Sequence, residues 1–214
     1  MNQRSSLPRG DLPRGEQQAE RADAARNRRA IMRAAEDLLQ RHEPAEVSIG
    51  RVAAAAGVGK ATVFHRFGSR VGLMRSLLQE RAEALRVATE CGPPPLGPGA
   101  SPHERLTAFI DALVELASHS VGLLTVQEHA AMTSKGGPVR QDDNPVYLFW
   151  HRHVSGLIAQ ARPDLDADPI AHVLLGATHD GPIAELLRAG QAERVAAALH
   201  QLADGLLSSR ISAR

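Results

Sequence analysis

The sequence has few of the residues on which several classes of protein depend. Aromatic residues make up only 3% of the 214 residues, so it offers little surface for stacking unpaired bases, and single-strand binding is not expected. A single cysteine, Cys91, excludes a disulfide framework and a zinc site built from several cysteines, and it fits a reducing environment. No apolar run approaches the roughly 20 residues of a membrane span, and the N-terminus lacks the apolar core of a signal peptide. We therefore expect a cytoplasmic protein with no membrane partner.

The motifs of common enzyme and metal sites are also missing. The sequence contains no G-x-S-x-G, no G-x-x-x-x-G-K and no H-E-x-x-H. Among the ten histidines, His151 and His153 would point about 200° apart on a helix and could not hold one ion. His172 and His179 would share a face but lie about 10 Å apart along the helix axis. We therefore expect no enzymatic activity, no cofactor and no metal site.

No stretch shows the alternation of apolar and polar residues that is typical of a strand, whereas helical spacing recurs along most of the chain. Ile31, Ala34, Ala35 and Leu38 form one such apolar stripe. The sequence therefore predicts an all-α fold of about nine helices, over roughly 22–41, 49–56, 59–67, 69–89, 101–120, 121–132, 145–161, 168–189 and 191–208. The helix over 168–189 is expected to be interrupted at Gly181–Pro182. Ser48 is a candidate N-cap, and Ser101 with Glu104 forms a capping box in which Pro102 takes the first helical position.

Charge and composition divide the chain into parts. Residues 1–90 hold 16 lysines and arginines against 11 acidic residues, whereas the remainder holds 9 against 13. The basic first part hints at a polyanionic partner. The predicted segments are a disordered tail or basic arm (1–21), a DNA-binding domain (22–70), a linking helix (71–90), a Pro- and Gly-rich linker (91–100) and a helical C-terminal domain (101–214).

The stretch SIGRVAAAAGVGKATVFHRF, residues 48–67, places two short helices around Gly57. This is the layout of a helix-turn-helix, whose second helix enters the major groove of DNA. Val63 and Phe67 would hold the second helix to the core, while Lys60 and Thr62 would face outward to phosphates or base edges. Small residues at 59 and 61 would let the backbone approach the DNA. Ser69 and Arg70 would supply backbone N–H groups and a cation at the start of the next helix, a natural phosphate site.

Residues 25–75 resemble the N-terminal domain of TetR-family transcriptional regulators. The resemblance rests on IMRAAEDLLQRH (31–42), SIGRVAAAAGVGKATVFHRFGSR (48–70) and Leu73. It implies that DNA is contacted from positions along the helix-turn-helix, namely Ser48, Gly59, Lys60, Ala61, Thr62, Phe64, His65, Ser69 and Arg70. The chain departs from the family pattern at Phe64, where tyrosine is usual, at Gly50, whose neighbour Arg51 could read a base instead, and at the turn formed by His42-Glu43-Pro44.

The resemblance further implies that the C-terminal domain binds a small ligand and forms a homodimer. His153 lies on an apolar helix face beside Trp150, either as a core histidine with one hydrogen bond or as the wall of a ligand pocket. Weaker pocket candidates on neighbouring helices are Phe109, Gln127, Met132, Tyr147 and His179. In the last helix, Val195, Leu199, Leu202 and Leu206 recur at spacings of 4, 3 and 4, which suits either a dimer seam or a seam buried within the monomer.

By this resemblance, the expected function is that of a homodimeric repressor released from a palindromic double-stranded DNA operator by a small-molecule effector. Ligand binding would shift the helix at 69–89 and change the distance between the two recognition helices. Two alternatives remain open at this stage. The chain could be an activator, or it could be a ligand-binding or oligomerisation protein of the same fold that has lost operator binding.

Overall fold

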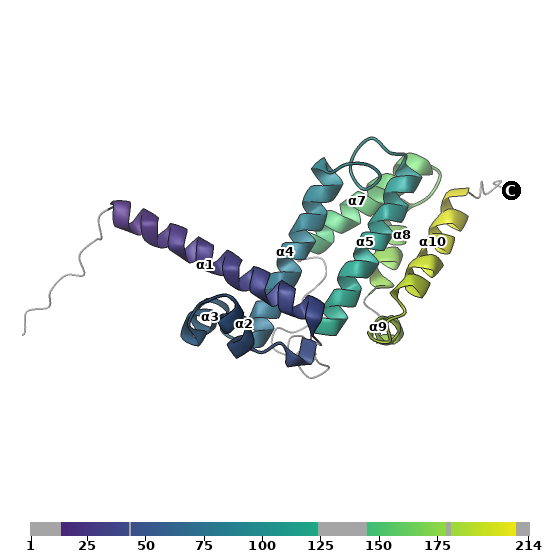
Figure 1. Cartoon of the computed structure of the whole chain (residues 1–214). Helices are drawn as coiled ribbons and strands as arrows, with labels where there is room; N and C mark the ends of the chain where they lie inside the picture. Colours follow the sequence, from purple (N-terminus) through teal and green to yellow (C-terminus); the bar gives the residue numbers. More distant parts are fainter. Residues whose placement is uncertain (1–13, 43, 124–144, 179–180, 209–214) are drawn as a thin grey trace, which may run out of the picture. The chain divides into compact units, whose positions relative to one another are not determined.

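A computed structural model describes residues 14–42, 44–123, 145–178 and 181–208 of the chain (Figure 1). Within these ranges the chain forms nine α-helices and one short 3-10 helix, and no strand. The prediction of an all-α fold with about nine helices is confirmed. The chain divides into two compact units, Met1–Arg70 and Val71–Arg214. None of the described helices is both long enough and apolar enough to cross a bilayer.

The first unit contains α1 (Arg14–Arg41), the 3-10 helix η1 (Pro44–Glu46), α2 (Ile49–Ala55) and α3 (Lys60–Phe67). Helix α2 packs against both α1 and α3. The small core of this unit is formed by Ile31, Met32, Ala34, Ala35, Val47, Ile49, Val52, Ala53, Val63 and Phe67. The predicted stripe of α1 thus reaches the core through Ile31, Ala34 and Ala35.

The start of α1 differs from the prediction, because the helix begins at Arg14 and not near Ala22. The segment after Pro13 is rich in Glu, Gln, Ala and Arg, which are strong helix formers. Gly15 lies in the first turn, where it interrupts no internal helical hydrogen bond. Residues 14–21 are therefore part of the helix and do not belong to a disordered tail, whereas residues 1–13 lie outside the described part.

Local signals fix the turn between α2 and α3. Ser48 is the N-cap of α2, as predicted, and its side chain accepts a hydrogen bond from the Arg51 N–H. At the other end, the N–H of Gly57 donates to the Ala54 carbonyl and the N–H of Val58 donates to the Ala53 carbonyl. This is a Schellman motif, whose left-handed residue is Gly57 with φ 66°. Helix α3 then begins directly after Gly59.

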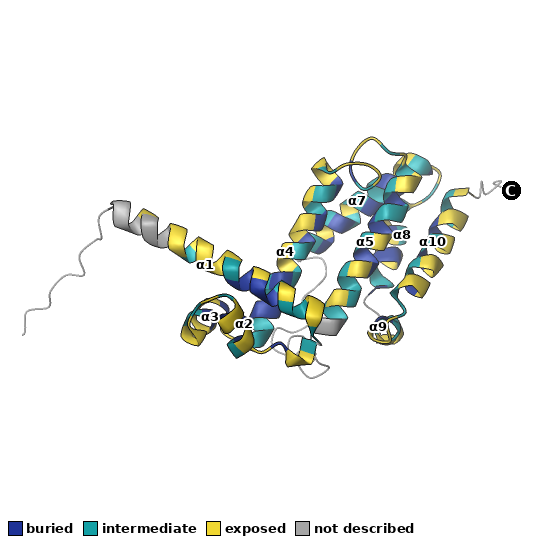
Figure 2. Cartoon of the chain, viewed as in Figure 1, coloured by how far each residue is buried: buried dark blue, intermediate teal, exposed yellow. Residues whose placement is uncertain are grey.

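The second unit is built around α5 (Pro102–Leu123). This helix packs against α7 (Pro145–Ala161), α9 (Gly181–Arg188) and α10 (Ala192–Ser208), while α8 (Ala167–Gly176) packs on α7. The buried positions of α5 lie in the first two-thirds of the helix (Figure 2) and include the predicted Leu106, Phe109, Ile110 and Leu113. Helix α4 (Arg70–Cys91) adds Ala82 and Leu85 to the same core.

The predicted capping box is present at the start of α5. The N–H of Ser101 donates to the Glu104 carboxylate at 2.9 Å, and the N–H of Glu104 donates to the Ser101 hydroxyl at 3.3 Å, so the capping box is confirmed. Hydrogen bonds from Ser101 also hold the pKa of Glu104 below its usual range. The proline- and glycine-rich loop 92–101 connects α4 to α5 within the second unit.

The predicted interruption at Gly181–Pro182 is present, but it is a full break between two helices and not a kink within one. The structure has two separate helices, α8 ending at Gly176 and α9 beginning at Gly181. Two glycines and Pro182 in this short stretch weaken helix propagation more than a single kink would require. The helix expected at 121–132 and the loop expected at 134–144 fall almost wholly on residues 124–144, which lie outside the described residues.

The seam predicted on the last helix is largely used within the chain itself. Val195 and Leu199 are 4% and 5% exposed and belong to the core formed with α5 and α9. They are therefore not available to a partner helix, and the expectation of an interface is wrong for these two residues. Leu206 is half-buried against the same core, whereas Leu202 is 62% exposed.

A buried arginine connects the end of α7 to α10. Arg162, 6% exposed, forms two parallel hydrogen bonds of 2.7 Å with the Asp164 carboxylate and donates a third to the Leu206 carbonyl at 2.7 Å. The Asp164 carboxylate raises the pKa of the Arg162 guanidinium, so the charge is secure. This bidentate geometry is the strong form of an arginine–carboxylate contact.

We expect Arg162→Ala to lower the midpoint of urea unfolding clearly, because the Leu206 carbonyl and the Asp164 carboxylate lose their donor together. The matched control is Arg152→Ala, which removes an exposed arginine from the same stretch of chain. Circular dichroism across a urea titration is the measurement. Equal midpoints for the two variants would mean that the cluster around Arg162 does not stabilise the second unit.

Candidate nucleic-acid interface and candidate ligand pocket

Helix α3 has one face in the core and one face in solvent. Val63 is 0% and Phe67 is 8% exposed, which holds the helix to the first unit. Arg28 of α1 covers the outer side of this attachment, with its guanidinium 5.2 Å from the centre of the Phe67 ring. The residues predicted to face DNA are exposed along the opposite side, with Thr62 half-buried: Gly59, Lys60, Ala61, Phe64 and His65.

The exposed side of α3 combines a cation with small residues. The Lys60 ammonium lies 5.8 Å from the centre of the Phe64 ring, which keeps the two side chains together one turn apart. A Cβ added at Gly59 would meet only the Thr62 hydroxyl, at 3.7 Å, so internal packing does not require a glycine here. Because Gly59 and Ala61 have little or no side chain, another molecule can approach the backbone of α3 closely at these positions.

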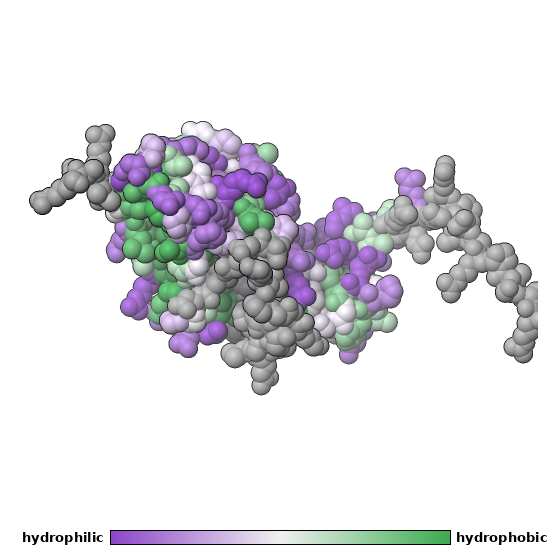
Figure 3. All heavy atoms as spheres, turned by 180° about the vertical axis from the view of Figure 1, so that it is seen from behind, coloured by the Kyte–Doolittle hydropathy of each residue, from purple (hydrophilic) through white to green (hydrophobic). Residues whose placement is uncertain are grey.

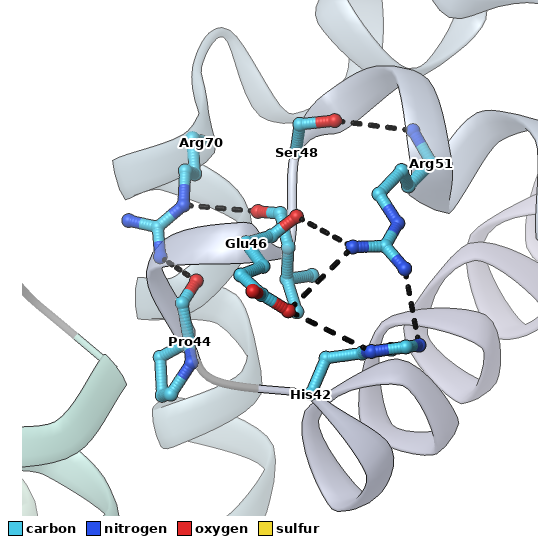
Figure 4. A network of polar contacts seen from close by, with 7 residues as sticks. His42, Pro44, Glu46, Ser48, Arg51 and Arg70 are labelled. Atoms are coloured by element: carbon cyan, nitrogen blue, oxygen red, sulfur yellow. Dashed lines mark hydrogen bonds and ion pairs between the residues drawn. The ribbon is translucent and has the colours of Figure 1, made fainter.

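Arg51 is held by a network within the first unit (Figure 4). Its guanidinium donates to the Glu46 carbonyl at 3.2 Å, lies 3.1 Å from Nε2 of His42 and pairs with the Glu46 carboxylate at 3.9 Å. All three groups are partly exposed, so the contacts are weak enough to exchange. The turn 42–46, where the chain departs from the family pattern, thus supplies the partners of Arg51.

Arg70 is also engaged within the first unit, on the other side of η1 (Figure 4). Its Nε donates to the Val47 carbonyl at 3.0 Å and its Nη2 donates to the Pro44 carbonyl at 2.5 Å. The Ser69 N–H donates to the Phe67 carbonyl at 2.8 Å. The expectation that Ser69 offers a free N–H to a phosphate is therefore wrong, because the tight turn after α3 already uses it.

The predicted ligand residues do not all come together. Phe109 of α5 lies between Trp150 and His153 of α7, with ring centres 6.4 Å and 5.1 Å away, and Phe149 stacks on His153 at 6.2 Å. Tyr147 faces α8 instead, where its hydroxyl lies 2.5 Å from Nδ1 of His172. Three further candidates, Gln127, Met132 and His179, lie outside the described residues.

His153 is kept neutral by its surroundings. Burial among aromatic rings, and secondarily the positive charge of Arg105, lower the pKa of His153 from 6.5 to about 4. Its Nε2 is buried and has no hydrogen-bond partner among the described residues, and the same holds for Nε1 of Trp150 and Nε of Arg105. Three polar atoms without partners around one aromatic cluster are unusual, since buried polar groups are nearly always paired.

One group of possible metal-binding side chains was not predicted from the sequence. His151 of α7 lies beside Asp168 and His172 of α8, and these residues offer ligand atoms within 4.8 Å of one another. The histidines had been compared only with neighbours on the same helix. The spacing of four residues between Asp168 and His172 was the available signal, but it identifies a site only once α8 is known to pack on α7.

Comparisons with known proteins agree with this architecture. Residues 31–77 match the family model of the bacterial regulatory proteins of the TetR family, a range that contains α2, α3 and the start of α4. No curated protein is similar enough in sequence to count as a match.

Several solved structures share the fold. A TetR-family transcriptional regulator from Rhodococcus sp. is 20% identical with a TM-score of 0.56, and the alignment covers 85% of this chain and 98% of that one. A TetR regulator from Streptomyces coelicolor is 21% identical with a TM-score of 0.56, covering 84% and 98%. A regulator from Saccharomonospora viridis, solved in complex with choline, is 22% identical with a TM-score of 0.53, covering 82% and 94%.

The likeness to these structures extends over both units, and the match to the family model falls on the helix-turn-helix itself. Regulators of this family are not enzymes, which confirms the expectation drawn from the missing catalytic motifs. Residues 31–77 therefore match the DNA-binding part of TetR-family regulators, and the described residues share the fold of solved TetR-family structures.

Proposed function

We propose that the chain is a homodimeric repressor that leaves its operator when a small molecule binds the second unit. The observation that carries the DNA-binding part is the outward face of α3, where Lys60 and the small residues 59 and 61 are exposed while Val63 and Phe67 are buried. A recognition helix needs this division, because it must stay attached to its scaffold while it lies in the major groove. The role places the protein in the cytoplasm, where its operator is.

Within this interface, we propose that Lys60 contacts a phosphate and that Thr62, Phe64 and His65 lie against the DNA. Ser48 and Arg51 lie at the start of α2, the helix that crosses the backbone in this motif. The exposed contacts of Arg51 with His42 and Glu46 can be exchanged for a phosphate or a base at little cost. Arg70, in contrast, supports the carbonyl groups of η1 and positions the start of α2.

Dimerisation is proposed through exposed apolar side chains of the second unit. Val173 on α8 is 71% exposed and Leu202 on α10 is 62% exposed, and Figure 3 shows hydrophobic surface among hydrophilic patches on the back of this unit. Large exposed aliphatic residues favour a protein partner. A second copy related by a two-fold axis would present two copies of α3 to a palindromic operator.

The ligand is proposed to bind where α5 and α7 bring Phe109, Trp150 and His153 together. The unpartnered nitrogens of Trp150 and His153 would orient a largely apolar molecule, and a neutral imidazole can either donate to it or accept from it. The complex of the Saccharomonospora viridis regulator with choline gives a precedent for a small molecule in this fold. Helix α4 starts where the first unit ends, so we propose that it transmits the change to the DNA-binding helices.

Lys60→Ala should weaken binding to a DNA duplex that the protein selects from a random-sequence pool. The slope of log affinity against log salt should fall by about one, because one phosphate contact releases about one counterion. Fluorescence anisotropy over a range of salt concentrations measures both quantities. Arg188→Ala, which removes an exposed arginine from α9, is the control and should change neither. If no duplex is enriched at all, the chain is a ligand-binding or oligomerisation protein that has lost operator binding.

Arg70→Met should give a different signature. Loss of the donors to Pro44 and Val47 should lower the melting temperature and weaken DNA binding, while the salt slope stays that of the wild type. Differential scanning fluorimetry and the same anisotropy titration separate the two effects. A salt slope reduced by about one at an unchanged melting temperature would show instead that Arg70 contacts phosphate directly.

His153 should make the stability of the protein depend on pH. Its folded pKa, about 4, lies below its ordinary value of 6.5, so the unfolded chain binds a proton first as the pH falls. At neutral pH His153 is uncharged in both states and does not lower the free energy of unfolding. As the pH falls from 6.5 to 4, His153 should lower this free energy progressively. Urea unfolding of the wild type, His153→Leu and His153→Gln at several pH values measures this. Both variants should show a flatter pH dependence than the wild type, and identical profiles would mean that His153 protonates freely in the folded protein.

A further inference from the structure

Two pairs of polar side chains face each other where α8 packs on α7. Tyr147 and His151 are four residues apart on α7, and Asp168 and His172 are four residues apart on α8. Residues at this spacing share one face of a helix. The two helices run in opposite directions, so His151 meets Asp168 and His172 while Tyr147 meets His172.

The contacts among these residues are close. The rings of His151 and His172 have centres 4.0 Å apart, and Nε2 of His151 lies 3.1 Å from the carbonyl oxygen and 3.6 Å from a carboxylate oxygen of Asp168. The ring of Tyr147 stacks on His172 at 5.8 Å, and its hydroxyl contacts Nδ1 of His172. His151 is largely buried, with 14% of its side chain exposed, whereas Asp168 and His172 reach solvent.

We propose that His151, Asp168 and His172 form a binding site for one divalent transition-metal ion, such as Zn²⁺, Ni²⁺ or Cu²⁺. Two imidazoles with one carboxylate suit these ions, whereas Mg²⁺ and Ca²⁺ prefer sites built from oxygen alone. The three ligands come from two facing helices, an arrangement that helical proteins use for metal sites. The ion leaves at least one coordination position for water or another donor, and it links α7 to α8.

The distances require only a small adjustment. Ligand atoms around a tetrahedral ion with bonds of about 2.1 Å lie about 3.4 Å apart. The three ligand atoms of this site lie within 4.8 Å of one another, so the longest separation must shorten by up to about 1.4 Å. Asp168 can provide this movement, because 74% of its side chain is exposed and its contact with His151 is long.

Tyr147 determines which nitrogen of His172 faces the ion. Since its hydroxyl engages Nδ1, Nε2 is the nitrogen that remains for coordination, and Nδ1–H then donates to the hydroxyl oxygen. An outer partner of this kind orients a metal-binding histidine and fixes its tautomer. The hydrogen bonds of the metal-free cluster could alternatively serve only to hold α8 on α7, and metal titration distinguishes the two roles.

Isothermal titration calorimetry of the full-length protein, without an affinity tag, with NiCl₂ and separately with ZnCl₂ tests the site. We expect one ion per chain, and we expect His151→Gln, Asp168→Asn and His172→Gln each to weaken binding at least tenfold. The matched control is His200→Gln, which disrupts a histidine–aspartate pair with Asp111 elsewhere in the same unit and should leave metal binding unchanged. Binding that none of the three variants alters, or no binding to the wild type, would overturn the proposal.

A second measurement tests the site in the wild type alone before any variant is compared. The electron paramagnetic resonance spectrum of the wild type with less than one equivalent of Cu²⁺ should show coupling to two imidazole nitrogens. His172→Gln should reduce this to one nitrogen, with the helix content of each variant checked by circular dichroism. A wild-type spectrum without nitrogen coupling would exclude the site.

Discussion

The left-handed backbone of Gly57 is the constraint on which the candidate DNA-binding surface depends. At φ 66° this residue ends α2 and lets the amides of Gly57 and Val58 close hydrogen bonds onto the last turn of that helix. A side chain at this position would strain the backbone by about 1 kcal/mol or more. The turn sets the direction of α3, and this direction decides that Val63 and Phe67 are buried while Lys60 and Phe64 face solvent. The left-handed conformation of Gly57 therefore helps to determine which side chains of α3 are exposed.

The polar groups around this turn divide into two kinds. Arg70 donates to the carbonyls of Pro44 and Val47, at either end of the turn before α2, and so it supports the backbone of the motif. Arg51 makes longer contacts with exposed partners, so the network around it can be rearranged when an anion arrives. Two arginines that look equivalent in the sequence thus differ in their surroundings. Arg70 contacts two backbone carbonyls, whereas Arg51 contacts one backbone carbonyl and the exposed side chains of His42 and Glu46.

Much of the fold could be predicted from sequence because its signals are local. The helical stripe at Ile31, Ala34 and Ala35, the Ser101 capping box and the Gly57 turn depend on residues within a few positions of one another. The failures involve longer distances. The spacing of Val195 and Leu199 fits a partner helix equally well whether that helix is α5 of the same chain or one from a second copy. The partners of Arg70, 23 and 26 residues away, and the meeting of His151 with His172 depend on packing that no local pattern specifies.

Helix α7 links the two candidate binding sites of the second unit. Residues on a helix turn by about 100° each, so His151 and His153 point in nearly opposite directions. One ion therefore cannot be held by both residues. The same geometry assigns each histidine to a different neighbour: His153 faces Phe109 of α5, and His151 faces Asp168 and His172 of α8. One rigid helix therefore carries an apolar site on one side and a polar site on the other, and an ion that holds α7 against α8 would also restrain the wall of the proposed ligand pocket.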